Sequence, residues 1–351
     1  MSNVNVVLAH KLDILDKYLR LEANELIFTK SCEFFVDYGD RWERIVDEKL
    51  DYEFLTSFLQ QIATRRHQRF NEKYPSLSCE LPPPYLRYRV QAQHESILFN
   101  SDVSICIRIP SNKRFELESF KLSDKLIQQG WNYDLIRQFI RDKKNVLVSG
   151  GTGSGKTSFL NSLMGEIPKE DRVVTIEDSQ ELFIENENRT QIAIPKEEGI
   201  YTYTTAINNA MRLRPDRLFL GEIDIRNTLA FLRVNNSGHE GNLSTLHANS
   251  TEDSINAIIT NSMFSGMNTS REAMLDYIRS AIDFIIQIAR VKRERIIVDI
   301  LNVKEYLKPS LQSSMQVNTQ TYQSNANDKE LYMIAKAEPR IKDTHEWVKS
   351  Y

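Results

Sequence analysis

The sequence contains a glycine-rich segment with the residue types needed to bind phosphate. Residues 150–157 read GGTGSGKT, which fits the pattern GxxxxGK[ST]. In this pattern successive backbone N–H groups turn toward phosphate oxygens, the lysine reaches the β and γ oxygens, and the last hydroxyl ligates Mg²⁺. The predicted nucleotide-binding residues of this segment and its flank are Gly150, Gly151, Thr152, Gly153, Ser154, Gly155, Lys156, Thr157 and Ser158.

The residues on either side of the loop support this interpretation. The apolar run Val146–Val148 precedes the loop, and the helical pattern SFLNSLM at 158–164 follows it. A glycine-rich turn of this pattern arises by chance in roughly one chain in a hundred of this length, and the flanks make chance less frequent still. The loop therefore predicts nucleotide binding, although it does not separate a motor from a kinase or a GTPase.

Acidic residues that follow two apolar runs are candidates for acting on water or on a metal ion. Glu177 ends the run Val173–Ile176, and we favour it as the general base. Glu181 either acts on water or on a metal ion as well, or caps the next helix. Glu222 follows the run Arg217–Leu220 through a glycine that allows close packing. A glutamate at the end of one strand is weak evidence when taken alone.

Arginines and histidines near these runs have two interpretations each. Arg212 and Arg214 either stabilise charge on a transferred phosphate or form surface ion pairs. His239 and His247 lie in SGHEGNLSTLHAN at 237–249. A histidine in such a segment is more often a core residue or a metal ligand than a phosphate sensor. The pair has no HExxH spacing, so the pattern does not predict a metal site.

The elements that must position these residues fall into two groups. After residue 145 short apolar runs alternate with helical segments, which is typical of an α/β fold with a mostly parallel sheet. Before Pro110 the helical patterns Leu8–Leu19 and Tyr52–Arg65 accompany short β-like runs, which indicates a smaller α+β domain. The runs predicted as strands of this domain are Glu25–Phe28, Cys32–Tyr38, Trp42–Val46, Tyr88–Gln93 and Val103–Ile109.

Four segments follow from these patterns. We predict an N-terminal α+β domain at 1–110, a linker with a helical entry at 111–143, and a nucleotide-binding domain at 144–307. The last segment, 308–351, is rich in Ser, Gln and Asn, so we expect a flexible tail.

Composition narrows the classes of partner. The 351 residues include 45 Lys and Arg against 48 Asp and Glu, and a net charge of -3 provides no general attraction to nucleic acid. Direct nucleic-acid binding is therefore not expected. The cysteines Cys32, Cys79 and Cys106 have no CxxC spacing, which favours a reducing cytoplasm over a disulfide framework. No apolar run approaches the roughly 20 residues of a membrane-spanning helix, so we expect any membrane association to be peripheral.

Four motifs taken together resemble a known family. GGTGSGKT, TIEDSQEL, RLRPDRLFLGE and SGHEGNLSTLHAN are similar, in order and spacing, to the Walker A, Asp box, Walker B and His box of type IV secretion ATPases of the VirB11 family. These motifs lie within 145–249. YRVQ at 88–91 and SICIRIPS at 104–111 resemble the end of the family's N-terminal domain, and the first 80 residues match in outline.

The resemblance implies a RecA-like ATPase domain, a separate N-terminal domain, and nucleotide bound between the two. It also implies a homohexamer that binds ATP and Mg²⁺ and works at the cytoplasmic face of the bacterial inner membrane. Its expected partners are other secretion-system ATPases and inner-membrane components. Mg²⁺ is expected on Thr157, with Glu177 or Glu222 acting through water.

The resemblance also assigns roles that the patterns alone leave open. Arg89 and Arg108 stand where the family's N-terminal domain reaches phosphate. Arg212 stands at the place of a catalytic arginine, and His247 at the place where the His box senses the γ-phosphate. The predicted catalytic residues are therefore Glu177, Glu222, Arg212 and His247.

One segment departs from the family pattern. After Glu222 and Ile223 the family usually has an arginine followed by Gly or Ser and Glu-Ala, whereas residues 224–228 read DIRNT. Contacts between subunits near Asp224 are therefore open to two interpretations. Either Arg226 replaces the missing charge, or this enzyme is slower than its relatives.

Three other functions remain as alternatives. A type II secretion or pilus motor is the nearest, and because no cysteine follows Cys106 to form a four-cysteine zinc module, the pilus-retraction type fits better than the assembly type. Asp224 suggests an ATP-binding scaffold that hardly turns over, while Glu177, Glu222 and His247 argue against one. A helicase or packaging motor has the least support, because no basic patch interleaved with aromatic residues is present.

Overall fold

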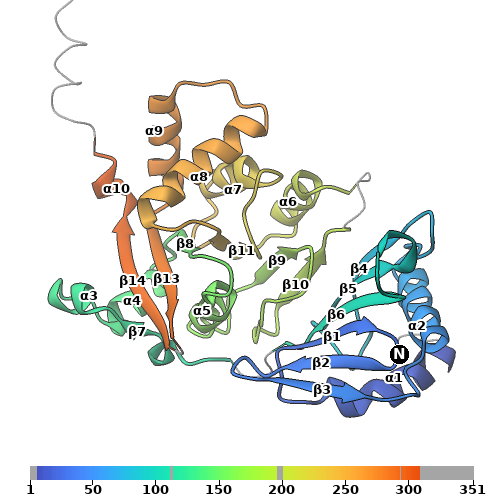
Figure 1. The fold of residues 1–351 in the computed structure, drawn as a ribbon. Coiled ribbons are helices and arrows are strands. Elements are labelled where there is room, and N and C mark those ends of the chain that lie inside the picture. The colour runs from blue at the N-terminus through green and yellow to red at the C-terminus, as the bar shows by residue number, and fades with distance from the viewer. Residues whose placement is uncertain (1–5, 111–113, 196–200, 293, 309–351) are drawn as a thin grey trace, which may run out of the picture. The chain divides into compact units, whose positions relative to one another are not determined.

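The chain forms one antiparallel sheet near its N-terminus and a mostly parallel sheet layer beyond it (Figure 1). The structure is a computed structural model that describes residues 6–110, 114–195, 201–292 and 294–308. The predicted mixed α/β fold is confirmed. The tail predicted at 308–351 lies outside the described residues, apart from Lys308.

The N-terminal part consists of two α-helices and a six-stranded sheet in the spatial order β3-β2-β1-β6-β5-β4. Every strand pair in this sheet is antiparallel. In chain order the elements are α1 (Val6–Leu19), β1 (Glu25–Lys30), β2 (Glu33–Asp37), β3 (Trp42–Val46), α2 (Tyr52–Arg65), β4 (Ser76–Glu80), β5 (Arg89–His94), the 3-10 helix η1 (Glu95–Ile97) and β6 (Val103–Arg108).

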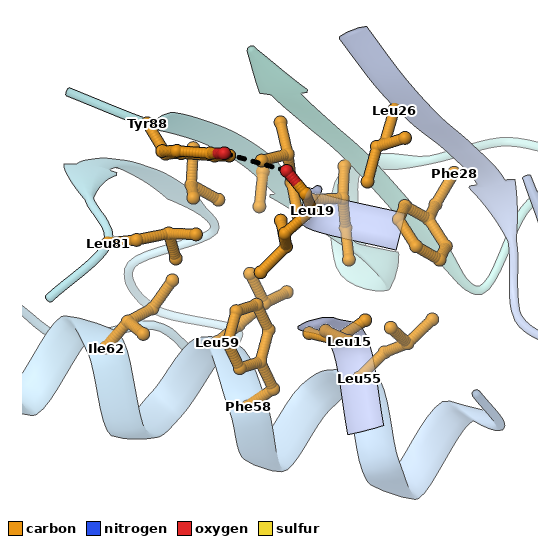
Figure 2. Close-up of a cluster of buried hydrophobic side chains, with 14 of the residues drawn as sticks. Leu15, Leu19, Leu26, Phe28, Leu55, Phe58, Leu59, Ile62, Leu81 and Tyr88 are labelled. Atoms are coloured by element: carbon orange, nitrogen blue, oxygen red, sulfur yellow. Dashed lines mark hydrogen bonds between the residues drawn. The ribbon is translucent and has the colours of Figure 1, made fainter. Parts of the chain in front are cut away.

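An apolar core lies between these two helices and the sheet. Apolar residues recur every three or four positions in α1 and α2, which gives each helix one apolar face. Leu15 of α1 and Leu59 of α2 are fully buried on those faces, in the same cluster as Phe28 of β1 (Figure 2). At the edge of this core the Tyr88 hydroxyl donates a 2.7 Å hydrogen bond to the carbonyl of Leu19. That bond ties the end of α1 to the start of β5.

The rest of the described chain is built on two adjoining groups of strands. One group has the order β10-β9-β11 and the other β12-β8-β13-β14-β7. They meet where the Ile223 N–H donates to the Thr245 carbonyl at 2.8 Å. In chain order the elements are η2 (Leu117–Ser119), β7 (Lys121–Leu122), α3 (Asp124–Gln128), α4 (Tyr133–Arg141), β8 (Val146–Ser149), α5 (Lys156–Met164), β9 (Val173–Glu177), β10 (Arg189–Ala193), α6 (Tyr203–Arg212), β11 (Arg217–Leu220), α7 (Thr228–Asn235), β12 (Leu243–Leu246), α8 (Thr251–Phe264), α9 (Arg271–Ala281), β13 (Phe284–Val291), β14 (Glu294–Asn302) and α10 (Val303–Tyr306).

The direction of these strands decides where the candidate catalytic residues lie. β10, β9 and β11 are parallel, and so are β12, β8 and β13, whereas β14 runs antiparallel to β13. The carboxyl ends of parallel strands meet at one edge of a sheet, where ligands bind. The loop 150–155, Glu177, Glu222 and His247 each follow or end one of these strands.

Helices cover both faces of this sheet layer. α6 to α10 pack against one face, and α3, α4, α5 and η2 pack against the other. Within the segment predicted as linker and helical entry, Phe120 packs edge to face on Phe159 of α5, with ring centroids 4.9 Å apart. This segment therefore shares a core with the strands that follow it, while the domain limits themselves stay a prediction. Among the described helices, none has both the length and the apolar character that crossing a membrane requires.

Candidate active site

The glycine-rich loop connects β8 to the first turn of α5. Gly155, the residue before the helix, has φ 98°, a left-handed conformation that residues with a Cβ rarely adopt. A Cβ at Gly155 would also lie 3.0 Å from Cδ of Arg295. Both the backbone and its surroundings therefore require glycine here, and α5 begins directly at Lys156.

The loop opens into a cavity of about 680 Å³. The wall includes six of the nine loop residues predicted to bind nucleotide, namely Thr152, Gly153, Gly155, Lys156, Thr157 and Ser158. Gly150, Gly151 and Ser154 do not line it. The carbonyl oxygens of Gly150 and Gly151 instead accept hydrogen bonds from Nζ of Lys156, at 3.0 and 3.1 Å.

Five of the six other predicted site residues line the same cavity. Glu177, Glu222 and His247 reach it from the ends of β9, β11 and β12, and Arg89 and Arg108 reach it from β5 and β6. The sixth is Arg212, at the end of α6. It lines a different pocket between α6 and α7, together with Arg233 and His239.

Lys156, His247 and Glu222 form a chain of polar contacts. Nζ of Lys156 lies 3.1 Å from Nδ1 of His247, and Nε2 of His247 lies 3.0 Å from Oε1 of Glu222. Nζ of Lys156 also lies 3.5 Å from Nε2, and a neutral imidazole with its proton on Nε2 fits both neighbours, because Nε2–H donates to the carboxylate and the ring adds no positive charge beside the lysine. The His box is thus in contact with both the phosphate-loop lysine and the acidic residue after β11.

Burial shifts the proton affinities of all three groups. Burial lowers the pKa of Lys156, and the nearby Glu222 opposes that shift. Burial and then the charge of Lys156 lower the pKa of His247, which favours the neutral imidazole. Burial raises the pKa of Glu222, against the effect of Lys156. Such shifts are typical of functional sites.

Glu177 is the most deeply buried acid of the cavity wall, with 5% of its surface exposed. Burial raises the pKa of Glu177 to about 8, although Oε1 accepts hydrogen bonds from the N–H groups of Glu181 and Leu182 at 2.8 and 2.9 Å. Gly221 lies directly over this side chain, because a Cβ there would be 3.2 Å from Cγ of Glu177. The close packing expected at Gly221 is therefore packing against Glu177, and the missing Cβ leaves room for the buried carboxyl side chain.

Arg89 and Arg108 contribute two positively charged side chains to the cavity wall. They are register partners on the antiparallel strands β5 and β6. Oε1 of Glu181 accepts a 2.9 Å hydrogen bond from Arg89 and lies 3.5 Å from a guanidinium nitrogen of Arg108. Glu181, for which the sequence leaves open a role on water or metal or as a helix cap, thus contacts both arginines. Oε1 of Glu80, on β4, accepts from the N–H of Gln180 next to it at 2.9 Å.

Asp224, where the sequence departs from the family pattern, takes part in a local ion pair. Asp224 and Arg226 are joined by an ion pair, and the Arg226 guanidinium lies 5.1 Å from the ring centroid of Tyr203. Tyr203 lines the cavity, whereas Asp224 and Arg226 do not. The charge of Arg226 is therefore matched by Asp224 within the same turn.

Sequence reasoning missed several cationic residues of this cavity. Arg87, Arg290 and Arg295 line it, and so does Phe115. Arg290 and Arg295 lie in the stretch ARVKRERI, which has the appearance of a solvated surface turn. No local signal places them, because their position depends on the pairing of β13 with β14.

The residues suited to Mg²⁺ are few. Within the described ranges, no group of three or more His, Cys, Asp and Glu side chains could hold a metal ion. The hydroxyl residue Thr157 and the carboxylate of Glu222 both face the cavity. This donor set fits Mg²⁺, which keeps several waters and takes one or two protein oxygens together with substrate phosphates.

Comparison with known proteins decides the family. A family model described as "Type II/IV secretion system protein" matches residues 91–345, which is more than half of the chain. The chain belongs to this family. The predicted relation to VirB11-type secretion ATPases is confirmed, and with it the prediction of an ATPase of the secretion class.

Individual members of the family match over most of their length. The type IV secretion system protein VirB11 of Bartonella henselae is 26% identical over 328 residues, covering 83% of this chain and 91% of that protein. The conjugal transfer protein TrbB of Rhizobium radiobacter is 30% identical over 241 residues, covering 67% and 70%. The crystal structure of the pilus retraction motor PilT with bound ADP has a TM-score of 0.64 at 18% identity, covering 87% and 89%, which shows a shared fold.

Proposed function

We propose that this chain hydrolyses ATP in the cavity at the phosphate loop and uses the energy to assemble, or move substrate through, a type IV secretion or conjugation system. The observation that carries the proposal is the contact of Lys156 with His247 and of His247 with Glu222 at the ends of neighbouring parallel strands. This arrangement links a group that binds phosphate to one that can orient water.

Binding of ATP requires Lys156 to exchange partners. Its ammonium group now contacts the carbonyls of Gly150 and Gly151 and the imidazole of His247. Phosphate oxygens would replace some of these contacts, and charge-assisted hydrogen bonds to phosphate are stronger than bonds to neutral carbonyls. Release of His247 from the lysine would then report that the γ-phosphate is in place.

Glu222 is the better candidate to position the attacking water. The sequence favours Glu177, but that carboxyl is buried, accepts two backbone N–H bonds, and keeps its proton at neutral pH because its pKa is raised to about 8. Glu222 has nearly half of its side chain exposed to the cavity. We therefore assign orientation of water to Glu222 and support of the 177–182 turn to Glu177.

Thr157 and Glu222 would hold Mg²⁺, directly or through water. When bound, the ion would neutralise charge on the phosphates and fix their geometry. Arg89 and Arg108, now held by Glu181, would contact phosphate from the side of β5 and β6. Arg212 faces another pocket of its own chain, so we propose that it acts at a neighbouring subunit of a homohexamer.

The cellular setting is proposed from the relatives. A homohexamer would work at the cytoplasmic face of the bacterial inner membrane, attached peripherally. Its partners would be other ATPases and inner-membrane components of the secretion system. Two relatives carry names that point to type IV secretion and to conjugal transfer, which supports both settings.

The test is steady-state ATPase activity of the purified protein, measured together with its mass in solution with and without Mg-ATP. Lys156→Ala and Glu222→Gln should each lower turnover about 100-fold or more, the order of loss seen when one group that stabilises the transition state is removed. Glu170→Gln removes an exposed carboxylate as a control and should leave turnover unchanged. Wild-type rates in Lys156→Ala would refute the site, and ATP binding without turnover in the wild type would favour the scaffold alternative.

A further inference from the structure

The hairpin of β13 and β14 brings two arginines into the nucleotide cavity. Arg290 and Arg295 are register partners on these antiparallel strands, and both line the cavity. Like charges directly opposite each other on paired strands destabilise a sheet. Among the described residues neither arginine forms an ion pair, so their charges are left without a carboxylate partner.

The side chain of Arg295 is held in a defined place. Its guanidinium lies 4.3 Å from the ring centroid of Phe115, and its stem passes over the backbone of Gly155. The side chain is about half-buried, and burial together with the charge of Arg290 lowers the pKa of Arg295. A cation fixed on an aromatic ring, beside the loop that binds phosphate, is prepared for an anionic and planar ligand.

The other parts of the site already account for the three phosphates. The loop N–H groups serve the α- and β-phosphates, Lys156 serves the β- and γ-phosphates, and Arg89 and Arg108 approach from β5 and β6. The ribose and the base have no assigned protein group. Thr157 and Ser158, which follow Lys156 in α5, also line the cavity.

We infer that Arg295, supported by Phe115 and assisted by Arg290, forms the subsite for the nucleoside part of the nucleotide. Arg295 would stack its planar guanidinium against the base, as arginine does on nucleic-acid bases. This inference rests on the proposed function, because it deepens the description of the same cavity. ADP and ATP share the contacted part, so both should depend on Arg295 to the same degree.

Calorimetric titration of the full chain with ATP, ADP and inorganic tripolyphosphate tests the subsite. Arg295→Met keeps the apolar stem over Gly155 and removes the charge and the planar group. It should weaken ATP and ADP binding by roughly tenfold, the effect of losing one stacking contact with the base, and leave tripolyphosphate binding unchanged. Lys292→Met is the matched control, because Lys292 is an exposed cation of the same hairpin that does not line the cavity.

The outcomes separate the subsite from the rest of the proposal. Equal losses for tripolyphosphate and ATP would place Arg295 at the terminal phosphates and overturn the inference, as would unchanged ATP binding in Arg295→Met. Wild-type protein that binds no ATP would overturn the proposed function itself. If Arg295→Met does not fold, Arg295→Lys keeps the charge and should lose part of the affinity for ATP and none for tripolyphosphate.

Discussion

Replacement of Glu177 by glutamine should remove the loss of stability that ionisation of Glu177 causes as the pH rises. The carboxyl is buried at the end of β9, and burial raises its pKa from 4.5 to about 8. Oε1 accepts two backbone hydrogen bonds, from Glu181 and Leu182, and the carbonyl of a glutamine can accept the same two. Glu177→Gln therefore keeps the local structure and removes only the group that resists ionisation.

The sign and size of the effect follow from proton linkage. The pKa of Glu177 is higher in the folded protein than in the unfolded chain, so the folded state binds the proton more tightly. The resulting stability is fully present below pH about 4.5 and is lost as the pH rises through about 8. Between pH 6 and pH 8 the free energy of unfolding should fall by about 2 kcal/mol, which lowers the melting temperature by about 4 to 8 °C in a domain of this size.

The assay is thermal unfolding of both proteins at pH 6 and pH 8, followed by circular dichroism in the absence of nucleotide. Other titrating groups are common to the two proteins, so only the difference between their pH shifts is interpreted. Glu170→Gln, at an exposed position, should shift with pH as the wild type does. An identical pH shift in wild type and Glu177→Gln would mean that Glu177 is already ionised at pH 6, and the reasoning from burial would be wrong.

Two further predictions concern the charge at Glu181 and the core of the N-terminal part. Glu181→Gln should tighten ATP binding roughly fivefold, because it releases Arg89 from an ion pair of about 1 kcal/mol, and weaker binding in a titration would contradict this. Phe58→Ala should lower the free energy of unfolding by about 3 to 5 kcal/mol in urea, because the ring is fully buried in that core. A loss below about 1 kcal/mol would show that the core closes over the space.

Local patterns were sufficient for most elements of the fold. The predicted helix Tyr52–Arg65 and the predicted strands Trp42–Val46 and Arg217–Leu220 have the bounds found for α2, β3 and β11. Each of these segments has residue types that favour one conformation and is followed by a polar or turn-forming residue. β13 and β14 were not predicted, because a long apolar run before a charged turn does not by itself distinguish a strand from a buried helix.

The parts of the site that sequence reasoning missed depend on contacts between distant segments. The phosphate loop and His247 could be found because each motif is contiguous in the sequence. The contact of Glu181 with Arg89 joins residues 92 positions apart, and the pairing of Arg290 with Arg295 requires the register of a hairpin. For Arg212 the family resemblance supplied a role, whereas the fold directs the end of α6 to a separate pocket.

The short strand β7 couples the segment before it mechanically to β14. β7 pairs in parallel with β14 through Lys121 and Leu122, and Phe115, a few residues earlier, lies under the guanidinium of Arg295. The segment that arrives from the N-terminal sheet is thus fastened along the strand that carries Arg295. Tension applied to residues 114–120 would therefore act as shear on β14 and on the contact of Phe115 with Arg295.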